Sequence, residues 1–278
     1  MAESQTLTAY FTYCELQKNL DSKTLKAYRI DLKQFVDQHP SPTAITRGEM
    51  EHYIEYLMAR YKTATVKRKV AALKAFYRYL VYEEILEHSP FEKIQIHIRQ
   101  EVLLPRVIDR PTLEAIFSAA YDDLKRAKSC LTRQNIIRNI AVLELLFASG
   151  IRVSELCTIT CDNLNLTSQV VLIRGKGNKE RQIYLASSPV IDALKAYSKV
   201  RSPYNENEVF FFLNRDGKRL SEQSVRRIVN RYTNLAQQSG HYTPHMFRHS
   251  FATYLWDTCG DVSVSYTHLR AHETLSDG

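Results

Sequence analysis

An apolar stripe at helical spacing constrains the fold of the first third of this chain more than any other feature. Between residues 66 and 81, apolar side chains recur every three or four positions: Val66, Val70, Leu73, Phe76, Tyr77, Leu80 and Val81. This spacing is typical of a helix that buries one face. Weaker stripes of the same period occupy residues 25–36 and 53–57. A single helix cannot bury such a stripe alone, so we expect a bundle of about four helices over the first hundred residues.

Local signals predict where helices of this bundle begin. Ser22 precedes the first stripe and is expected to be an N-cap. A loop containing Pro40 and Pro42 follows. Thr46 and Glu49 then have the spacing of a capping box, which predicts the start of the next helix.

The helical pattern stops at residues 95–110, a stretch that lacks helical period and contains Pro105. A chain of 278 residues is long enough for two domains. We therefore assign residues 1–96 to an N-terminal helical domain, 97–110 to a linker and 111–263 to a second domain.

The second domain is expected to be mostly helical with a small antiparallel sheet, so the fold class is mainly α with an α+β second domain. Asp109 and Pro111 predict a helix to about Tyr121, and a stripe over residues 136–147 predicts a buried helix that stops at Gly150. Alternating apolar residues on both sides of the 175–178 turn predict a β-hairpin. Two further helices are expected, one capped by Ser221 and ending near Gln238, and one opened by Thr243 and Pro244 and closed by Gly260.

Composition narrows the class of partner. The formal net charge is +8 and the isoelectric point is about 9.1, which favours a polyanion, although charge alone fits a basic protein with no such partner equally well. Five cysteines without a C-x-x-C pair, and no secretory signal, indicate reduced thiols in the cytoplasm. No apolar run approaches the length that spans a membrane.

A run of positive charge accompanies the longest stripe. Residues 62–78 carry six Lys and Arg and no Asp or Glu. A solvated helix face usually mixes both signs, so a row of backbone phosphates explains the run better than solvent exposure does. We assign DNA contact to Lys26, Lys67, Arg68, Lys69 and Lys74.

Three sequence blocks in the second half carry cations suited to phosphate chemistry. They read A-S-G-I-R-V-S-E-L, I-R-G-K-G-N-K-E-R and T-P-H-M-F-R-H-S, and contain Arg152, Lys176, His245 and Arg248. A guanidinium can donate a pair of hydrogen bonds to a phosphate, but Arg152 could instead form a salt bridge with Glu155. Lys176, taken alone, is an ordinary exposed turn lysine.

His245 and Arg248 are three residues apart near a helix N-terminus, so they share a face at its positive end. His249 could form a metal-binding pair with His245, but Met246 stands where H-E-x-x-H has its glutamate. We therefore expect His249 to pack within the helix, and we expect no metal and no cofactor.

In this order the three blocks resemble the tyrosine recombinase (phage integrase) family, and the resemblance extends from about Leu7 to about Val262. It implies a SAM-like core-binding domain that clamps DNA, followed by an integrase catalytic domain. By resemblance, Arg152 and Arg248 bind the scissile phosphate, Lys176 is the general acid and His245 assists proton transfer. Lys179 is expected to contact DNA at most. The implied reaction joins DNA to a tyrosine through a 3′-phosphotyrosyl link, in a tetramer on two duplexes.

The C-terminal segment departs from the family pattern. After F-A-T-Y-L the expected L-G-H is missing, and V-S-Y-T-H-L-R-A-H-E-T matches one reading frame of a sequencing adapter. We therefore expect truncation near Val262 and a non-native tail over residues 264–278. Tyr266 lies 18 residues after Arg248 (266 − 248), too few for the family's intervening turn and helix. The chain is thus expected to bind DNA without cleaving it.

Two other functions fit the same residues. A DNA-binding protein without chemistry needs only the basic helices, and a type IB topoisomerase uses similar cations to relax supercoils. The two-domain layout with a basic helical N-terminal domain favours the recombinase.

Overall fold

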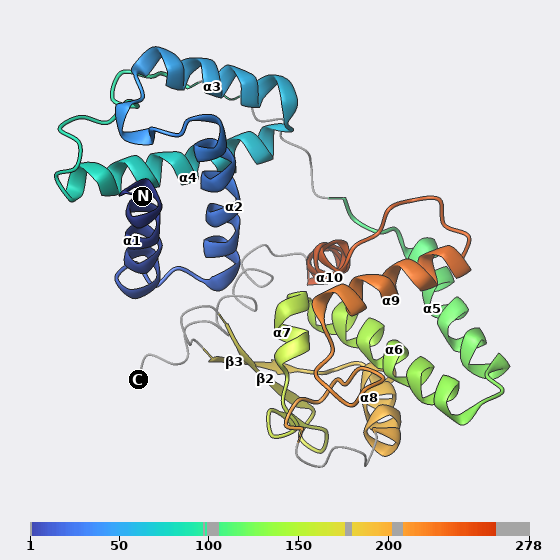
Figure 1. Cartoon of the computed structure of the whole chain (residues 1–278). Helices are drawn as coiled ribbons and strands as arrows, with labels where there is room; N and C mark the ends of the chain where they lie inside the picture. The colour runs from blue at the N-terminus through green and yellow to red at the C-terminus, as the bar shows by residue number, and fades with distance from the viewer. Residues whose placement is uncertain (1, 97, 99–105, 176–179, 202–207, 260–278) are drawn as a thin grey trace. The chain divides into compact units, whose positions relative to one another are not determined.

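The computed structural model describes residues 2–96, 98, 106–175, 180–201 and 208–259. The chain divides into two compact units, Met1–Leu103 and Leu104–Gly278 (Figure 1). The division falls inside the 97–110 segment that the sequence assigns to a linker, and each unit has its own buried core.

The first unit is a helical bundle with α4 at its centre. Its helices are α1 (Ala2–Leu16), α2 (Ser22–Gln38), α3 (Arg47–Arg60) and α4 (Thr63–Tyr82), with the short 3-10 helix η1 (Pro42–Ala44). Helix α4 packs against α2 and α3, and α1 packs against α2. Phe35, Met50, Phe76 and Tyr77 are fully buried between these helices. The Tyr77 hydroxyl donates to the carbonyl of Pro42 at 2.7 Å, which ties α4 to the loop after α2.

The predicted helix starts are partly right. Thr46 and Glu49 form the capping box: the Thr46 backbone N donates to Glu49 Oε2 at 2.7 Å, and the Glu49 backbone N donates to Thr46 Oγ1 at 3.3 Å. The prediction for Ser22 is wrong, because Asp21 is the N-cap of α2. The Asp21 carboxylate accepts from the backbone N of Lys23 at 2.8 Å and of Thr24 at 3.2 Å, so it satisfies two amides that lack helical partners.

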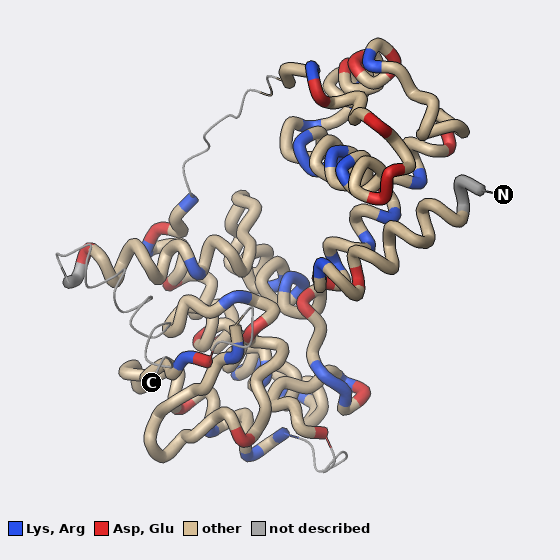
Figure 2. The backbone as a smooth tube through the Cα atoms, turned by 90° about the vertical axis from the view of Figure 1, so that its left-hand side faces the viewer, with Lys and Arg blue, Asp and Glu red and all other residues tan. Residues whose placement is uncertain are grey.

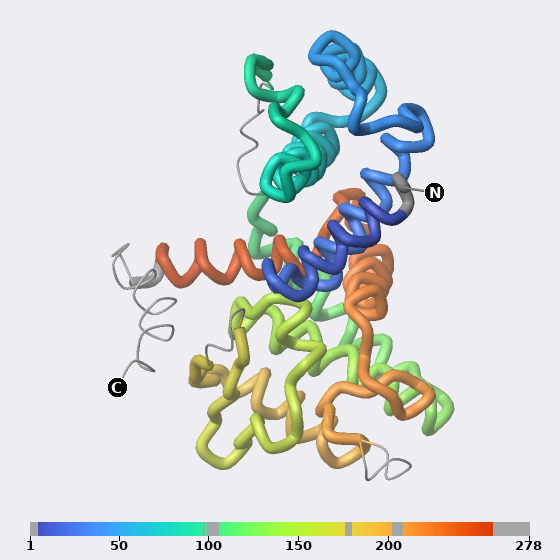
Figure 3. Tube along the Cα trace, turned by 60° about the vertical axis from the view of Figure 1, so that its left-hand side comes forward, coloured from blue at the N-terminus to red at the C-terminus, as the bar shows by residue number. Residues whose placement is uncertain are grey.

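The second unit is mainly helical around α6, as predicted. It contains α5 (Arg110–Arg126), α6 (Cys130–Ser149), α7 (Val153–Thr158), α8 (Ser188–Val200), α9 (Glu222–Leu235) and α10 (Pro244–Cys259). Helix α6 is buried along most of its length and contacts α5, α8 and α10. Helix α10, which can be followed in orange-red in Figure 3, contacts both α6 and α9.

A three-stranded antiparallel sheet completes the second unit. Strands β1 (Leu164–Asn165), β2 (Val170–Arg174) and β3 (Glu180–Tyr184) follow one another in spatial order. The predicted hairpin is confirmed as β2 and β3, paired in a register that sets Ile173 opposite Arg181. Val171 and Ile173 face the core, whereas Val170 and Leu172 are half-buried.

The helix ends of the second unit are close to prediction. Asp109 caps α5 by accepting from the backbone N of Thr112 at 2.8 Å, but α5 extends to Arg126 because Leu124 still packs on the core. Ser221 caps α9, which ends at Leu235, three residues before the predicted Gln238. Gly260 lies outside the described residues. No helix in the described ranges is long and apolar enough to cross a bilayer.

Candidate functional site

The junction between α6 and α7 brings α10 close to the first arginine. Gly150 ends α6 in the left-handed region, at φ 57° and ψ 21°. A Cβ at this position would lie 2.4 Å from Cδ1 of Phe251 in α10. Glycine is therefore required twice here, for the backbone conformation and for the approach of α10. Arg152, two residues later, is consequently placed next to α10.

Arg152 is held by Glu155, yet much of its side chain is exposed to solvent. It is the N-cap residue of α7, and its backbone N donates to Glu155 Oε2 at 2.7 Å. Its Nη1 donates to Glu155 Oε1 at 2.9 Å, while 54% of its side chain stays exposed. The salt bridge considered from the sequence is thus present. It uses one of five guanidinium donors, so it leaves donors available for a phosphate.

Arg181 is a buried partner of Glu155 that the sequence analysis missed. Its Nη1 donates to Glu155 Oε1 at 3.1 Å and its Nη2 to Oε2 at 2.8 Å, and both side chains are less than a tenth exposed. Burial alone would raise the pKa of Glu155, but the hydrogen bonds from Arg181 and Arg152 outweigh it and hold that pKa below its usual value. An arginine at an inward position of a strand, at the end of the block K-E-R, was the available signal.

Helix α10 carries the other two described candidates. The Nη1 of Arg248 donates to the carbonyl oxygen of Gly150. His245, exposed in the first turn, places its Nε2 2.9 Å from Nε2 of His249, so one ring donates and the other accepts. Burial, then the nearby His245 and Arg248, lower the pKa of His249, which favours its neutral form. Among the described residues no third metal-binding side chain joins this pair.

The structure therefore brings three of the four candidates to one junction. Arg248 binds the carbonyl two residues before Arg152, and His245 lies one turn before Arg248 on the same helix. Lys176 and Lys179 lie outside the described residues. The strands beside them pair up to Arg174 and Glu180, whose side chains form an ion pair at 2.7 Å. Convergence of all four on one phosphate remains a prediction.

Over both units as a whole, Lys and Arg are interspersed with Asp and Glu (Figure 2). The residues of the first unit that are assigned to DNA contact differ in how far they are exposed. Lys26, Arg68 and Lys74 are exposed and Lys67 is half-buried.

The DNA contact assigned to Lys69 needs correction. Its side chain is 5% exposed, and its Nζ lies 3.0 Å from Oδ1 of Asp31 in α2. Helical period places Lys69 on the buried face beside Val66 and Val70, so its charge neutralises a buried carboxylate and does not reach solvent. Counting charges along the sequence hid this, because the neutralising residue belongs to another helix.

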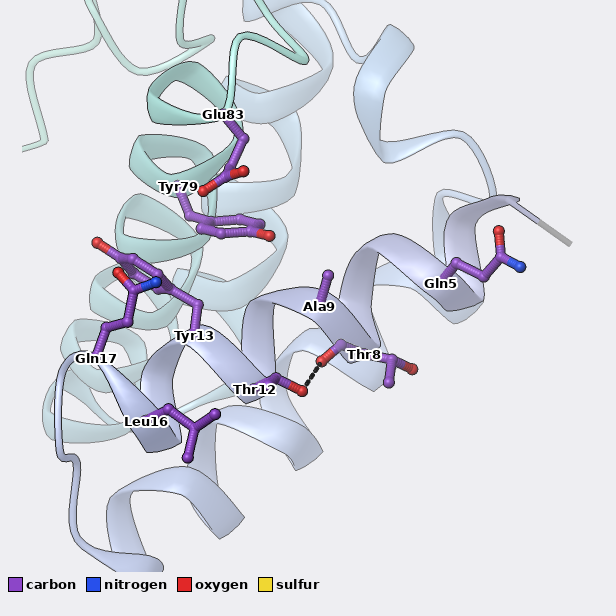
Figure 4. A pocket seen from close by; sticks show the side chains of 9 residues that line it. All are labelled: Gln5, Thr8, Ala9, Thr12, Tyr13, Leu16, Gln17, Tyr79 and Glu83. Atoms are coloured by element: carbon purple, nitrogen blue, oxygen red, sulfur yellow. Dashed lines mark hydrogen bonds between the residues drawn. The ribbon is translucent and has the colours of Figure 1, made fainter.

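Two large cavities do not suit a phosphate. One, of about 730 Å³, lies between α1 and α4 and is lined by Gln5, Thr8, Tyr13, Tyr79 and Glu83 among others, without any Lys or Arg (Figure 4). The other, of about 800 Å³, lies in the second unit and has a mainly apolar lining. The cationic junction of Arg152 and Arg248 is therefore the better candidate site for DNA chemistry.

Comparison with known families is consistent with this geometry. The profile described as Phage integrase family matches residues 112–275. The profile described as Phage integrase, N-terminal SAM-like domain, matches residues 7–84. Together the two matches cover both units of the structure.

Similar proteins are named as recombinases. A tyrosine recombinase of Agathobacter rectalis is 41% identical over 284 residues, covering 97% of this chain and 92% of that protein. A tyrosine recombinase XerC of Syntrophus aciditrophicus is 32% identical, covering 95% of this chain and 88% of that protein.

Solved structures show the same fold. XerH recombinase bound to a palindromic difH substrate aligns with a TM-score of 0.71 at 21% identity, covering 96% of this chain and 84% of that one. A lambda integrase dimer bound to a COC′ core site aligns with a TM-score of 0.70 at 17% identity, covering 99% and 96%.

The expected truncation near Val262 is not supported by these comparisons. The integrase profile continues to residue 275, and the similarity to the Agathobacter rectalis protein covers 97% of the chain.

Proposed function

The chain belongs to the phage integrase family of tyrosine recombinases, and from this premise we propose that its cationic site serves site-specific recombination of double-stranded DNA, by metal-free cleavage and rejoining at a tyrosine. The observation that carries the proposal is the contact of Arg248 with the Gly150 carbonyl, which joins two of the cationic blocks next to Arg152. This arrangement supports two guanidinium groups acting on one phosphate.

In the proposed reaction a tyrosine oxygen attacks the scissile phosphorus. A bond between tyrosine and phosphorus forms and the bond to the 5′ oxygen breaks, leaving a 3′-phosphotyrosyl link. Arg152 and Arg248 stabilise the charge that develops on the phosphate oxygens, which is the largest contribution such a site provides. His245 takes up or shares the tyrosine proton, and Lys176 donates a proton to the departing 5′ oxygen. The covalent link conserves the bond energy, so rejoining needs no ATP.

We further propose that neither Tyr254 nor Tyr266 is the nucleophile, so that this chain binds DNA without cleaving it. The hydroxyl of Tyr254 donates to the Ile108 carbonyl at 2.7 Å, and its ring packs edge-on against Phe147. Tyr266 lies outside the described residues, 18 positions after Arg248. The competing function is DNA binding without any chemistry. The hydrogen bond of the Tyr254 hydroxyl to the Ile108 carbonyl supports it equally, because it holds this tyrosine in the fold.

Partners and location follow from the substrate. XerH was solved bound to a difH substrate, and lambda integrase as a tetramer bound to a Holliday junction. We propose that this chain likewise binds double-stranded DNA, that the recombining form is a tetramer on two duplexes, and that it works in the cytoplasm, where that DNA lies.

A covalent-adduct assay tests the proposal. The chain first selects its preferred duplex from a random library, and that duplex is then supplied with a nick beside each position in turn. We expect retarded complexes that dissociate in detergent, and weaker retardation when Arg152 and Arg248 are both replaced by alanine. Detergent-resistant adducts that disappear in Tyr266→Phe would identify Tyr266 as the nucleophile and overturn that part of the proposal. A chain that selects no duplex would overturn the whole.

A further inference from the structure

The first unit contains a buried carboxylate that links two cations of a neighbouring helix. Asp31 in α2 has a side chain that is 1% exposed. It accepts from Nη1 of Arg68 and, at 3.0 Å, from Nζ of Lys69, both in α4. Helices α2 and α4 pack against each other where they cross (Figure 1). Asp31 therefore connects the two helices that carry most of the proposed DNA contacts.

The two cations play different parts in this cluster. Lys69 is enclosed: its Nζ also donates to Gln34 and lies 4.9 Å from the centre of the Tyr61 ring. The positive charge of Lys69 thus compensates the negative charge of Asp31 and is not available to DNA. The Arg68 side chain is 42% exposed, so its charge is the surplus one and lies at the surface. One Arg68 donor is engaged by Asp31, and the guanidinium has five.

We propose that Asp31 is a positioning residue that holds the Arg68 guanidinium ready for a DNA backbone phosphate. A long side chain loses rotamer freedom when it binds a phosphate, and that loss weakens binding unless the side chain is already held. The hydrogen bond to Asp31 fixes the orientation of the Arg68 guanidinium before DNA binds. The positive charge of Lys69 offsets the negative charge of the carboxylate, so that Asp31 does not repel the phosphate. The inference rests on the proposed DNA binding and adds a residue to it.

Charge and positioning make opposite predictions for the loss of this carboxylate. If Asp31 acts on DNA only through its charge, Asp31→Asn makes the chain more positive and tightens binding. If Asp31 positions Arg68, the same change weakens binding, because Arg68 must then be ordered during association. The sign of the change in affinity therefore separates the two.

The experiment measures binding of the whole chain to a fluorescent duplex by anisotropy at several salt concentrations. We expect Asp31→Asn to weaken binding about fivefold. The control is Asp37→Asn, an exposed aspartate on the same helix, which should leave affinity unchanged or raise it. In an Arg68→Gln background, Asp31→Asn should no longer weaken binding and should leave affinity unchanged or raise it, as Asp37→Asn does, because the side chain it positions is gone. Binding by Asp31→Asn as tight as the original, or equal losses in both backgrounds, would overturn the proposal.

A second variant covers the case in which Asp31→Asn does not fold, which circular dichroism would reveal. Arg68→Lys keeps the charge and the buried Asp31–Lys69 pair but removes the fork. The proposal predicts weaker binding with the same salt dependence, and full affinity of Arg68→Lys contradicts it. If the original chain binds no duplex at any salt concentration, the proposed function fails as well. If it binds and these variants match it, only the positioning role fails.

Discussion

Replacing Arg181 with methionine tests how strongly the buried ion pair stabilises the junction of α7 and β3. Methionine retains much of the aliphatic length but leaves Glu155 with only the two contacts from Arg152, at 2.7 and 2.9 Å. Glu155 is 6% exposed, so its charge would stay buried with one exposed partner. Removing one member of a buried pair typically costs about 3–5 kcal/mol. Because Arg152 remains, we expect about 3 kcal/mol, a large part of the roughly 5–15 kcal/mol that stabilises a domain.

A double variant shows whether the buried charge is the cause. Arg181→Met combined with Glu155→Leu removes both charges, so it should be more stable than Arg181→Met alone by about 1 kcal/mol or more. Urea unfolding followed by circular dichroism measures both, with the slopes compared to confirm that the transitions are alike. A cost below about 1 kcal/mol for Arg181→Met, or a double variant less stable than the single one, would refute the reasoning.

Three further predictions concern Glu155, Gly150 and the helix caps of the first unit. The folded-state pKa of Glu155 is depressed. The ionised Glu155 therefore contributes its full stabilisation above its unfolded pKa of about 4.3, and this stabilisation is lost as the pH falls through the folded pKa. The difference in free energy of unfolding between the original chain and Glu155→Gln should stay constant above the unfolded pKa and shrink below it during acid titration. Gly150→Ala should destabilise the second unit by about 1–3 kcal/mol through backbone strain, and further through the clash with Phe251. Gly48→Ala is the control: nothing lies within 4 Å of its Cβ, so it should not destabilise the first unit. Equal shifts of the thermal unfolding midpoint in the two variants would contradict this. Thr46→Ala removes the capping box of α3 and should cost about 1 kcal/mol in urea unfolding, while Ser22→Ala, which caps nothing, should cost less than half of that.

The sequence predicted those features that depend on residues near one another in the chain. The capping box at Thr46, the caps at Asp109 and Ser221, the stop at Gly150 and the hairpin all follow from local chemistry. The fold class followed from the period of the apolar stripes.

Long-range pairings were beyond the sequence analysis, for a physical reason. Lys69 looked like a DNA contact because Asp31, its partner, is 38 residues away on another helix. Arg181 was overlooked because its partner Glu155 is 26 residues away and buried with it. A charged residue at a position of the buried face was the sign in both cases, since a charge is buried only when it is paired.

A structure of the chain bound to its selected duplex tests the central claim most directly. The account predicts that the guanidinium groups of Arg152 and Arg248 both donate, at about 3 Å, to oxygens of the same phosphate. Guanidinium groups bound to different phosphates, or an Arg152 that turns away from the DNA with only Glu155 as its partner, would contradict it.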